Sequence, residues 1–224
     1  MLYDAGKCLY HQITMPNPTP STLHQQLRLA TKEPHHALDH HPLMARLLAP
    51  DISRREYGDA LVAMHGVVAS AEAALLAYLS HHPALFDYAP RRKLAALEAD
   101  LAVLGRHPAG TAVALPAIAC HGALFGTLYT LEGATLGGQF ISARLRQQGA
   151  GDFPLQFYTV YGDQTRSRWL AFLEYAEQRC PPAEYGRATA TAVALFDAIR
   201  GHLDTCYGPS LCAAAATTGA SSVK

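Results

Sequence analysis

Apolar residues recur every three or four positions along most of the chain, which is the spacing of α-helices that each bury one face. Alternating runs of β-branched residues, the pattern of strands, are almost absent. Ser53 and Glu56 form a capping box, a typical start of a helix. We therefore predict an all-α bundle of six to eight helices, with segments at about 22–40, 54–79, 90–105, 116–148, 164–179 and 183–206.

The two ends of the chain do not share this periodicity. Residues 1–20 end in the proline-punctuated stretch "MPNPTP", and residues 208–224 are rich in Ala, Ser and Thr. Such composition is typical of segments without a packed core. The pattern predicts a flexible leader over 1–20, one domain over 21–207 and a flexible tail over 208–224.

Charge and cysteine content narrow the classes of partner and compartment. The 18 basic and 18 acidic residues balance, and no basic run stands out, which argues against a nucleic-acid partner. Five cysteines without CxxC spacing, and an N-terminus unlike a signal peptide, favour a cytoplasmic protein without disulfides or structural zinc. The uncharged segment 112–131 is long enough to span a bilayer. Because it contains Pro116 and His121 and no second span accompanies it, we predict a buried core helix and no membrane span.

Four of the 12 histidines crowd into the stretch "EPHHALDHH". They could be solvated residues near a helix end. Glu33 and His36 form one E-x-x-H pair, but a carboxylate-bridged di-iron bundle needs two such pairs, and a second is absent from the sequence. The remaining possibility is that one histidine is an axial ligand of an iron-containing cofactor.

Helical spacing favours His35 as that ligand. In a helix over 22–40, Arg28, Lys32, His35 and Asp39 fall within one broad face. Asp39 can accept a hydrogen bond from Nδ1–H of His35 and so orient the ring for coordination through Nε2. The two cations stand one to two turns earlier, where they can meet anionic groups. Pro34 should bend the chain just before the ligand.

Two motifs about a hundred residues apart carry a family resemblance. "LRLATKEPHHALD" resembles the proximal-helix motif of haem oxygenases, and "YTLEGATLGGQ" resembles their distal-helix motif. The similarity extends over about 20–206 and is closest to the bacterial, bacteriophytochrome-associated branch. It implies a helical bundle that holds haem between a proximal and a kinked distal helix. It also implies that His35 binds the iron, that Asp39 orients it, and that Arg28 and Lys32 pair with the haem propionates.

The distal motif assigns further residues. In the family the glycines at Gly133, Gly137 and Gly138 let the helix backbone approach the porphyrin face. Without the first motif, Gly133 and Gly137 would fit an ordinary small-xxx-small helix contact. Mammalian members carry an aspartate where this chain has Ala134, so another group must help to deliver protons. His65 aligns with a tyrosine of their distal network; it either takes over part of that role or is a core histidine.

Three more residues are candidates for haem contacts by their motif positions. Phe196 lines the pocket or is a core phenylalanine, and Tyr158 and Arg168 reach the propionates or have structural roles. Tyr161 is a weaker candidate of the same kind.

The resemblance implies an enzyme in which haem is both cofactor and substrate. Dioxygen and external electrons would convert it to biliverdin, by resemblance the IXα isomer, with carbon monoxide and ferrous iron. Since the sequence has no flavin or nicotinamide motif, the electrons would come from a ferredoxin or a flavoprotein reductase. A bacteriophytochrome is a possible recipient of the biliverdin. The alternatives are a haem carrier on the same fold, for which Ala134 is the argument, and a helical interaction module that binds no haem.

Overall fold

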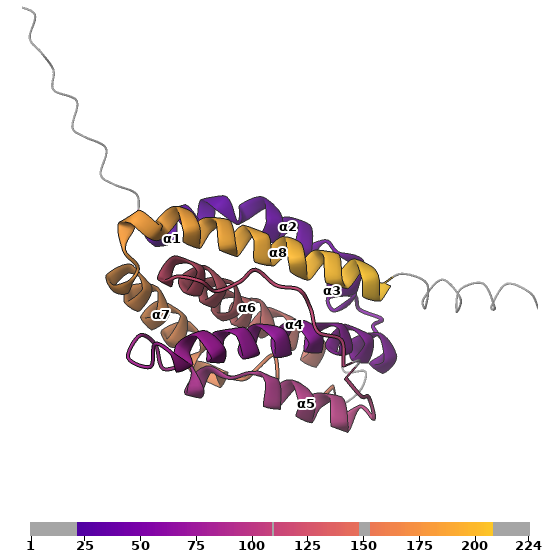
Figure 1. Cartoon of the computed structure of the whole chain (residues 1–224). Helices are drawn as coiled ribbons and strands as arrows, with labels where there is room; N and C mark the ends of the chain where they lie inside the picture. Colours follow the sequence, from indigo (N-terminus) through magenta and orange to yellow (C-terminus); the bar gives the residue numbers. More distant parts are fainter. Residues whose placement is uncertain (1–21, 109, 148–152, 208–224) are drawn as a thin grey trace, which may run out of the picture.

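The computed structural model describes residues 22–108, 110–147 and 153–207, so the predicted leader and tail lie outside the described residues. Within the described ranges the regular elements are all helical, as predicted, and none is a strand (Figure 1). The α-helices are α1 (Leu23–Ala30), α2 (Lys32–Asp39), α3 (Pro42–Arg46), α4 (Arg54–Ser80), α5 (Leu94–Val103), α6 (His121–Gln147), α7 (Thr165–Arg179) and α8 (Tyr185–Tyr207). Three short 3₁₀ turns are η1 (Ala89–Arg91), η2 (Gly162–Gln164) and η3 (Pro182–Glu184).

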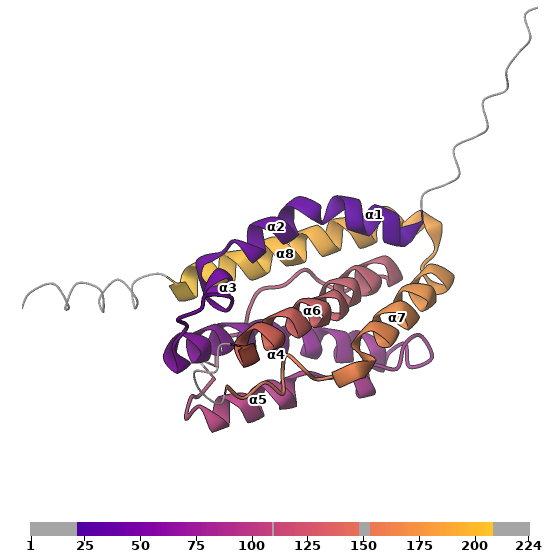
Figure 2. The same ribbon diagram turned by 180° about the vertical axis from the view of Figure 1, so that it is seen from behind.

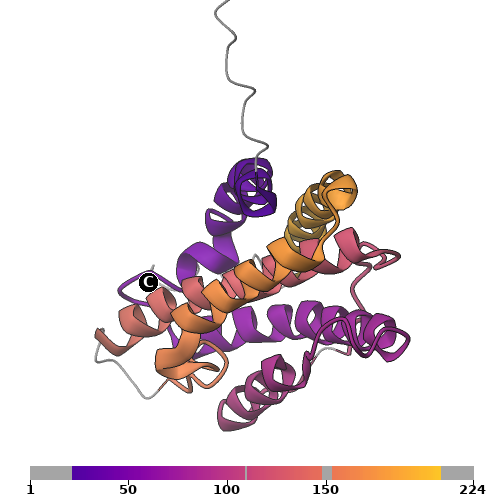
Figure 3. The same cartoon turned by 90° about the vertical axis from the view of Figure 1, so that its left-hand side faces the viewer.

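The helices are stacked in layers. Figures 1 and 2 show α1 and α2 lying along α8 on one side of the molecule, with α6 and α7 next to this layer. Helix α4 follows, and α5 is outermost on the opposite side, an order that is also visible in the side view of Figure 3. The largest buried cluster joins α1, α4, α6, α7 and α8 through side chains such as Leu27, Leu75, Phe125 and Phe172.

Two glycines fix the contact between α6 and α8. A Cβ at Gly122 would lie 2.5 Å from the carbonyl oxygen of Glu184, and one at Gly126 would overlap that of Ala188. Gly122 meets Glu184 and Arg187, and Gly126, one turn later in α6, meets Ala188 and Ala192, one turn later in the partner segment. The two helices therefore run parallel. The sequence analysis did not single out these glycines, although four-residue spacing of small residues is the usual signal of close helix packing.

We expect Gly126→Ala to destabilise the domain although alanine is the better helix former. The added methyl group has no space against the backbone of Ala188 and Ala192, so the helices must separate. Overpacking of this kind costs about 1–3 kcal/mol. Urea unfolding followed by circular dichroism measures the change; a variant as stable as the wild type would contradict the close contact.

The predicted helix over 22–40 is divided in two. The chain breaks at Thr31, whose φ and ψ are −90° and 0°, three residues before Pro34. Proline is tolerated in the first turn of a helix, where its missing N–H has no helical partner. Pro34 therefore lies inside the first turn of α2, and the bend precedes it. No side chain of α2 is fully buried; Pro34 and Leu38 are only partly covered.

Other boundaries also differ from the prediction. Helix α6 begins at His121 rather than near 116, because the segment before it has no regular secondary structure and the backbone N–H of Val113 donates to the Ser70 hydroxyl oxygen. The short helix α3 was not predicted; its N-cap is His41, whose Nδ1 accepts from the N–H of Leu43 at 3.2 Å. The capping box of Ser53 and Glu56 is confirmed at the start of α4.

The apolar segment predicted as a buried core helix is helical only from His121 onward, and nearly all of 121–131 is buried. Among the described helices, α4 alone is long and apolar enough to cross a membrane on those two criteria. Half of its most apolar stretch is buried inside the domain, as in the core helix of a globular protein.

Candidate functional site

We use the term wedge for the region bounded by His35 of α2, Phe196 of α8 and the glycine-bearing face of α6 near Gly137. Four glycines of α6 fall within about 60° of one another around the helix axis at about 100° per residue: Gly122, Gly126, Gly133 and Gly137. At Gly126 this face touches the backbone of α8, and at Gly122 it touches the carbonyl oxygen of Glu184, directly before α8. At Gly137, a Cβ would meet nothing within 4 Å. The same face of one helix thus passes from close contact to open space.

His35 lies across this space from the distal glycines. Tyr129 of α6 is hydrogen-bonded with the side chain of Thr31, so the residues one turn further along both helices, His35 and Gly133, come to the same level. The ring of Phe196 on α8 lies edge-on to the His35 imidazole, with 5.6 Å between the ring centres. Phe196 is buried and forms the base of the wedge between the two walls.

The His35 side chain is held by Asp39. Nδ1 lies 2.9 Å from Oδ2 of Asp39, one helical turn away, as the sequence spacing predicts. This contact favours the tautomer with the proton on Nδ1 and leaves a lone pair on Nε2. No described residue is recorded as a partner of Nε2, and the side chain is 60% exposed. The imidazole is therefore oriented and free to coordinate.

The three glycines of the distal motif differ in what surrounds them. Gly137 faces open space, whereas a Cβ at Gly133 would touch the edge of the Trp169 indole at 3.6 Å. At Gly138 a Cβ would meet the carbonyl oxygen of Tyr158 at 2.9 Å, on another side of the helix. Gly138 is therefore required by protein packing, whereas no described atom accounts for the missing side chain at Gly137.

Apolar and basic groups line the rim of the wedge. Phe140, one turn beyond Gly137, is 65% exposed, and Ala134 is exposed without a polar side chain. On the facing helices, Arg28 is exposed, and Lys32 has a side chain that is 77% exposed, with Nζ 4.0 Å from Glu33. Both cations are accessible to an anionic ligand.

An aromatic cluster closes the end of the wedge nearest α7. His24, Tyr129 and Trp169 come from α1, α6 and α7, and the ring centres of Tyr129 and Trp169 are 5.4 Å apart. Burial, assisted by the charge of nearby Arg28, lowers the pKa of His24. The sequence analysis missed this cluster. The only available signal was the position of Tyr129 inside the distal motif.

Four of the predicted site residues make contacts in other parts of the molecule: His65, Tyr158, Tyr161 and Arg168. Nε2 of His65 lies 3.2 Å from Glu98 of α5, the outermost helix in Figure 3. Arg168 donates to the carbonyl of Pro90 and stacks over the Tyr161 ring at 4.7 Å. Tyr158 is buried against Gly138. The structure does not bring these side chains together with His35 and Gly137, and their predicted roles stay predictions.

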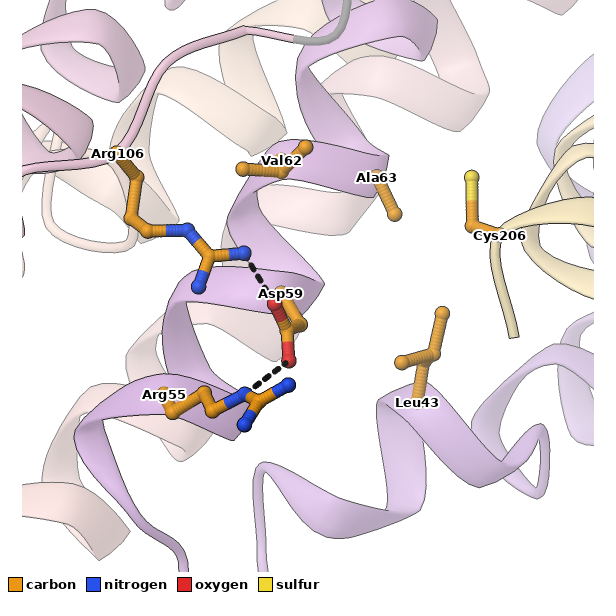
Figure 4. Close-up of a pocket in the computed structure, with 7 residues that line it drawn as sticks. All are labelled: Leu43, Arg55, Asp59, Val62, Ala63, Arg106 and Cys206. Atoms are coloured by element: carbon orange, nitrogen blue, oxygen red, sulfur yellow. Dashed lines mark hydrogen bonds and ion pairs between the residues drawn. The ribbon is translucent and has the colours of Figure 1, made fainter. Parts of the chain in front are cut away.

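A separate hollow of about 360 Å³ lies between α3, α4 and the end of α8 (Figure 4). Leu43, Val62, Ala63 and Cys206 form its apolar side. On the other side Asp59 pairs with both Arg55 and Arg106, so the charges are satisfied within the protein. This hollow contains none of the predicted site residues.

The wedge has the chemistry to hold a flat group that brings its own metal. Among the described residues, no three His, Cys, Asp or Glu side chains form a metal-binding group. His35 offers one oriented imidazole with Phe196 beside it, α6 carries glycines at 133 and 137, and the cations Arg28 and Lys32 are exposed. Gly137 in particular leaves space that a Cβ would occupy. These residues fit an iron porphyrin with carboxylate substituents.

Comparison with known proteins identifies the family of this chain. The family model described as "Heme oxygenase" matches residues 21–200. A heme oxygenase of Xanthomonas campestris pv. campestris is 37% identical over 116 residues, which cover 52% of this chain and 67% of that protein.

Two solved structures have a similar fold. Heme oxygenase-1 from the cyanobacterium Synechocystis, solved in complex with heme, has a TM-score of 0.69 at 16% identity and covers 88% of this chain and 98% of its own. The heme oxygenase from Leptospira interrogans has a TM-score of 0.64 at 18% identity and covers 83% of this chain and 100% of its own.

Proposed function

Because the chain belongs to the haem oxygenase family, whose members degrade haem, we propose that it cleaves haem to biliverdin IXα, carbon monoxide and ferrous iron. Two observations carry the proposal: the His35 imidazole is oriented by Asp39 at 2.9 Å, and a Cβ at Gly137 of α6 would meet nothing within 4 Å. Bound haem supplies a redox-active iron that activates O2 and the porphyrin ring that is oxidised. The protein must hold that ring in one orientation.

On the proximal side, we assign the iron ligand to Nε2 of His35. The contact of Nδ1 with Asp39 at 2.9 Å supports the assignment, because it holds the imidazole in the required tautomer and orientation. Phe196 packs against the edge of the same imidazole and limits its rotation. A neutral imidazole ligand also lacks the electron donation by which a thiolate favours cleavage of the O–O bond.

On the distal side, the backbone of 133–137 would cover the other face of the ring. The absence of a side chain at Gly137 and the exposed Phe140 support a close, largely apolar approach that excludes bulk water. Ala134 provides no carboxylate, so we assign proton delivery to water molecules bound along the α6 backbone. His65 stays a candidate for that network.

At the rim, we assign the haem propionates to Arg28 and Lys32. Arg28 lies in the last turn of α1 and Lys32 in the first turn of α2, before His35 in the chain, and both are exposed. Paired charges there would select the in-plane orientation of the ring and therefore the edge that is oxidised. We propose a ferredoxin or a flavoprotein reductase as the electron donor, a cytoplasmic location, and a bacteriophytochrome as one recipient of the biliverdin.

Adding hemin to the purified protein tests this function. We expect a Soret shift together with strong quenching of Trp169, the only tryptophan in the chain, which lies beside Gly133. Under O2 with a reductant, the Soret band should decay while biliverdin absorption grows. A stable bound spectrum under turnover conditions would favour a haem carrier, and the lack of any Soret shift or quenching would refute haem binding.

A further inference from the structure

A buried carboxylate directly precedes the distal glycines. Glu132 of α6 is 1% exposed, and the residue after it is Gly133. Its Oε1 accepts from Nζ of Lys93 at 2.7 Å and from the hydroxyl of Tyr161 at 3.0 Å. Its Oε2 accepts from the guanidinium of Arg91. One side chain of α6 thus connects this helix to the start of α5 and to the segment before α7.

A second pair of contacts holds α6 at the other end of the glycine stretch. Gly138 packs on the backbone of Tyr158, and Nε2 of Gln139 donates to the carbonyl of Gly162 at 3.2 Å. Both partners belong to the segment 158–162, which also contains Tyr161. Residues 133–137 therefore lie between two attachments of α6 to one segment, residues 158–162.

Electrostatics make the Glu132 attachment the stronger one. Burial lowers the pKa of Lys93, whereas Glu132 acts in the opposite direction and stabilises its charged form. Hydrogen bonds to charged groups in a water-free site are stronger than neutral ones, and a buried charge that loses its partner is strongly destabilised. Glu132, Lys93 and Arg91 are therefore fixed relative to one another, and α6 cannot slide or rotate without breaking these contacts.

We propose that Glu132 is a positioning residue for haem cleavage: through Lys93, Arg91 and Tyr161 it sets the position of the backbone at 133–137 and thereby the porphyrin edge that is oxidised. The inference rests on the proposed function, because it assumes that this backbone covers the distal face of the ring. The carboxylate itself contacts Lys93, Arg91 and Tyr161, so we assign it no direct contact with the substrate.

Glu132→Gln tests the proposal, and Glu72→Gln is its matched control. Glu72 is equally buried and binds the same region, since its carboxylate accepts from the backbone N–H groups of Lys93 and Leu94, but it belongs to α4. In the haem-free protein, we expect amide exchange across 133–139 to accelerate about tenfold in Glu132→Gln and not in Glu72→Gln.

With haem, Glu132→Gln should change the ratio of biliverdin isomers about tenfold, which corresponds to about 1.4 kcal/mol between competing edges. Glu72→Gln should retain the wild-type ratio even if it is less stable. If Glu132→Gln does not fold, Tyr161→Phe removes one hydroxyl contact and keeps every charge, and it should shift the ratio in the same direction.

Equal exchange and equal isomer ratios in the Glu132 and Glu72 variants would overturn the proposal and leave Glu132 a structural residue. So would an unchanged isomer ratio in folded Glu132→Gln or, where that variant does not fold, in Tyr161→Phe. A wild-type protein that does not degrade haem would refute the proposed function instead. The exchange measurement on the haem-free protein would still report whether Glu132 holds the glycine stretch.

Discussion

His35→Ala should lower haem turnover more than about a hundredfold, since loss of a residue that only supports a metal ligand already costs about 10–100-fold in affinity or activity. The imidazole is oriented by the Asp39 carboxylate at 2.9 Å, and in the described part of the chain its Nε2 has no partner. The variant should retain its helical content, because His35 is exposed and contributes little to the core. Haem titration and single-turnover absorption spectra measure the effect.

His36→Ala is the matched control for this prediction. His36 is the next residue on the same helix, is exposed, and stacks on His40 with 4.1 Å between the ring centres. It should bind and degrade haem like the wild type. Added imidazole should restore part of the His35→Ala spectrum, because it can enter the space left by the side chain. Unchanged spectra in His35→Ala would contradict the assignment of the iron ligand.

Gly137→Leu should prevent haem binding while it stabilises the protein without haem. Leucine is a better helix former than glycine by about 0.5–1 kcal/mol, and a Cβ at this position meets nothing within 4 Å. The larger side chain would project into the wedge and occupy the volume of the porphyrin. We expect a higher unfolding midpoint by urea denaturation and at least about a tenfold weaker hemin affinity, equivalent to about 1.4 kcal/mol.

Gly137→Ala should give an intermediate loss of affinity, because it adds one carbon instead of four. The opposite signs of the two effects distinguish a binding surface from a packing contact, since Gly126→Ala should lose stability instead. A Gly137→Leu protein that binds hemin as tightly as the wild type would show that the ring lies elsewhere.

The fold class followed from the sequence because periodicity and capping report local preferences. The capping box of Ser53 and Glu56 is confirmed, as is the all-helical content of the described residues. The contact of Asp39 with His35 was also predictable, since residues four apart on a helix face each other. The sequence analysis placed the bend at Pro34, whereas the helix is interrupted at Thr31. The effect of a proline depends on its position within a helical turn, and where that turn starts depends on tertiary contacts.

The site was harder to predict from the sequence, because it depends on which helix faces contact each other in the fold. Three glycines of one motif look equivalent in the sequence, yet Gly137 faces open space and Gly138 faces the Tyr158 backbone. Similarly, His65 follows a plausible alignment, whereas its nearest recorded partner is Glu98 of α5. Glu132 gave no signal at all, since only the folded chain brings Lys93, from 39 residues earlier, to its carboxylate.

The lack of any fully buried side chain in α2 has a consequence for the catalytic cycle. A helix that buries so little of itself has little free energy holding it to the rest of the domain, so it should open more readily than α6 or α8. The porphyrin would supply the missing apolar contact surface and tie the helix down through its iron. Under the proposed function, opening of the ring and loss of the metal would remove that support. Departure of the product and loosening of α2 would then be coupled, so the proposed reaction would itself weaken the retention of its product.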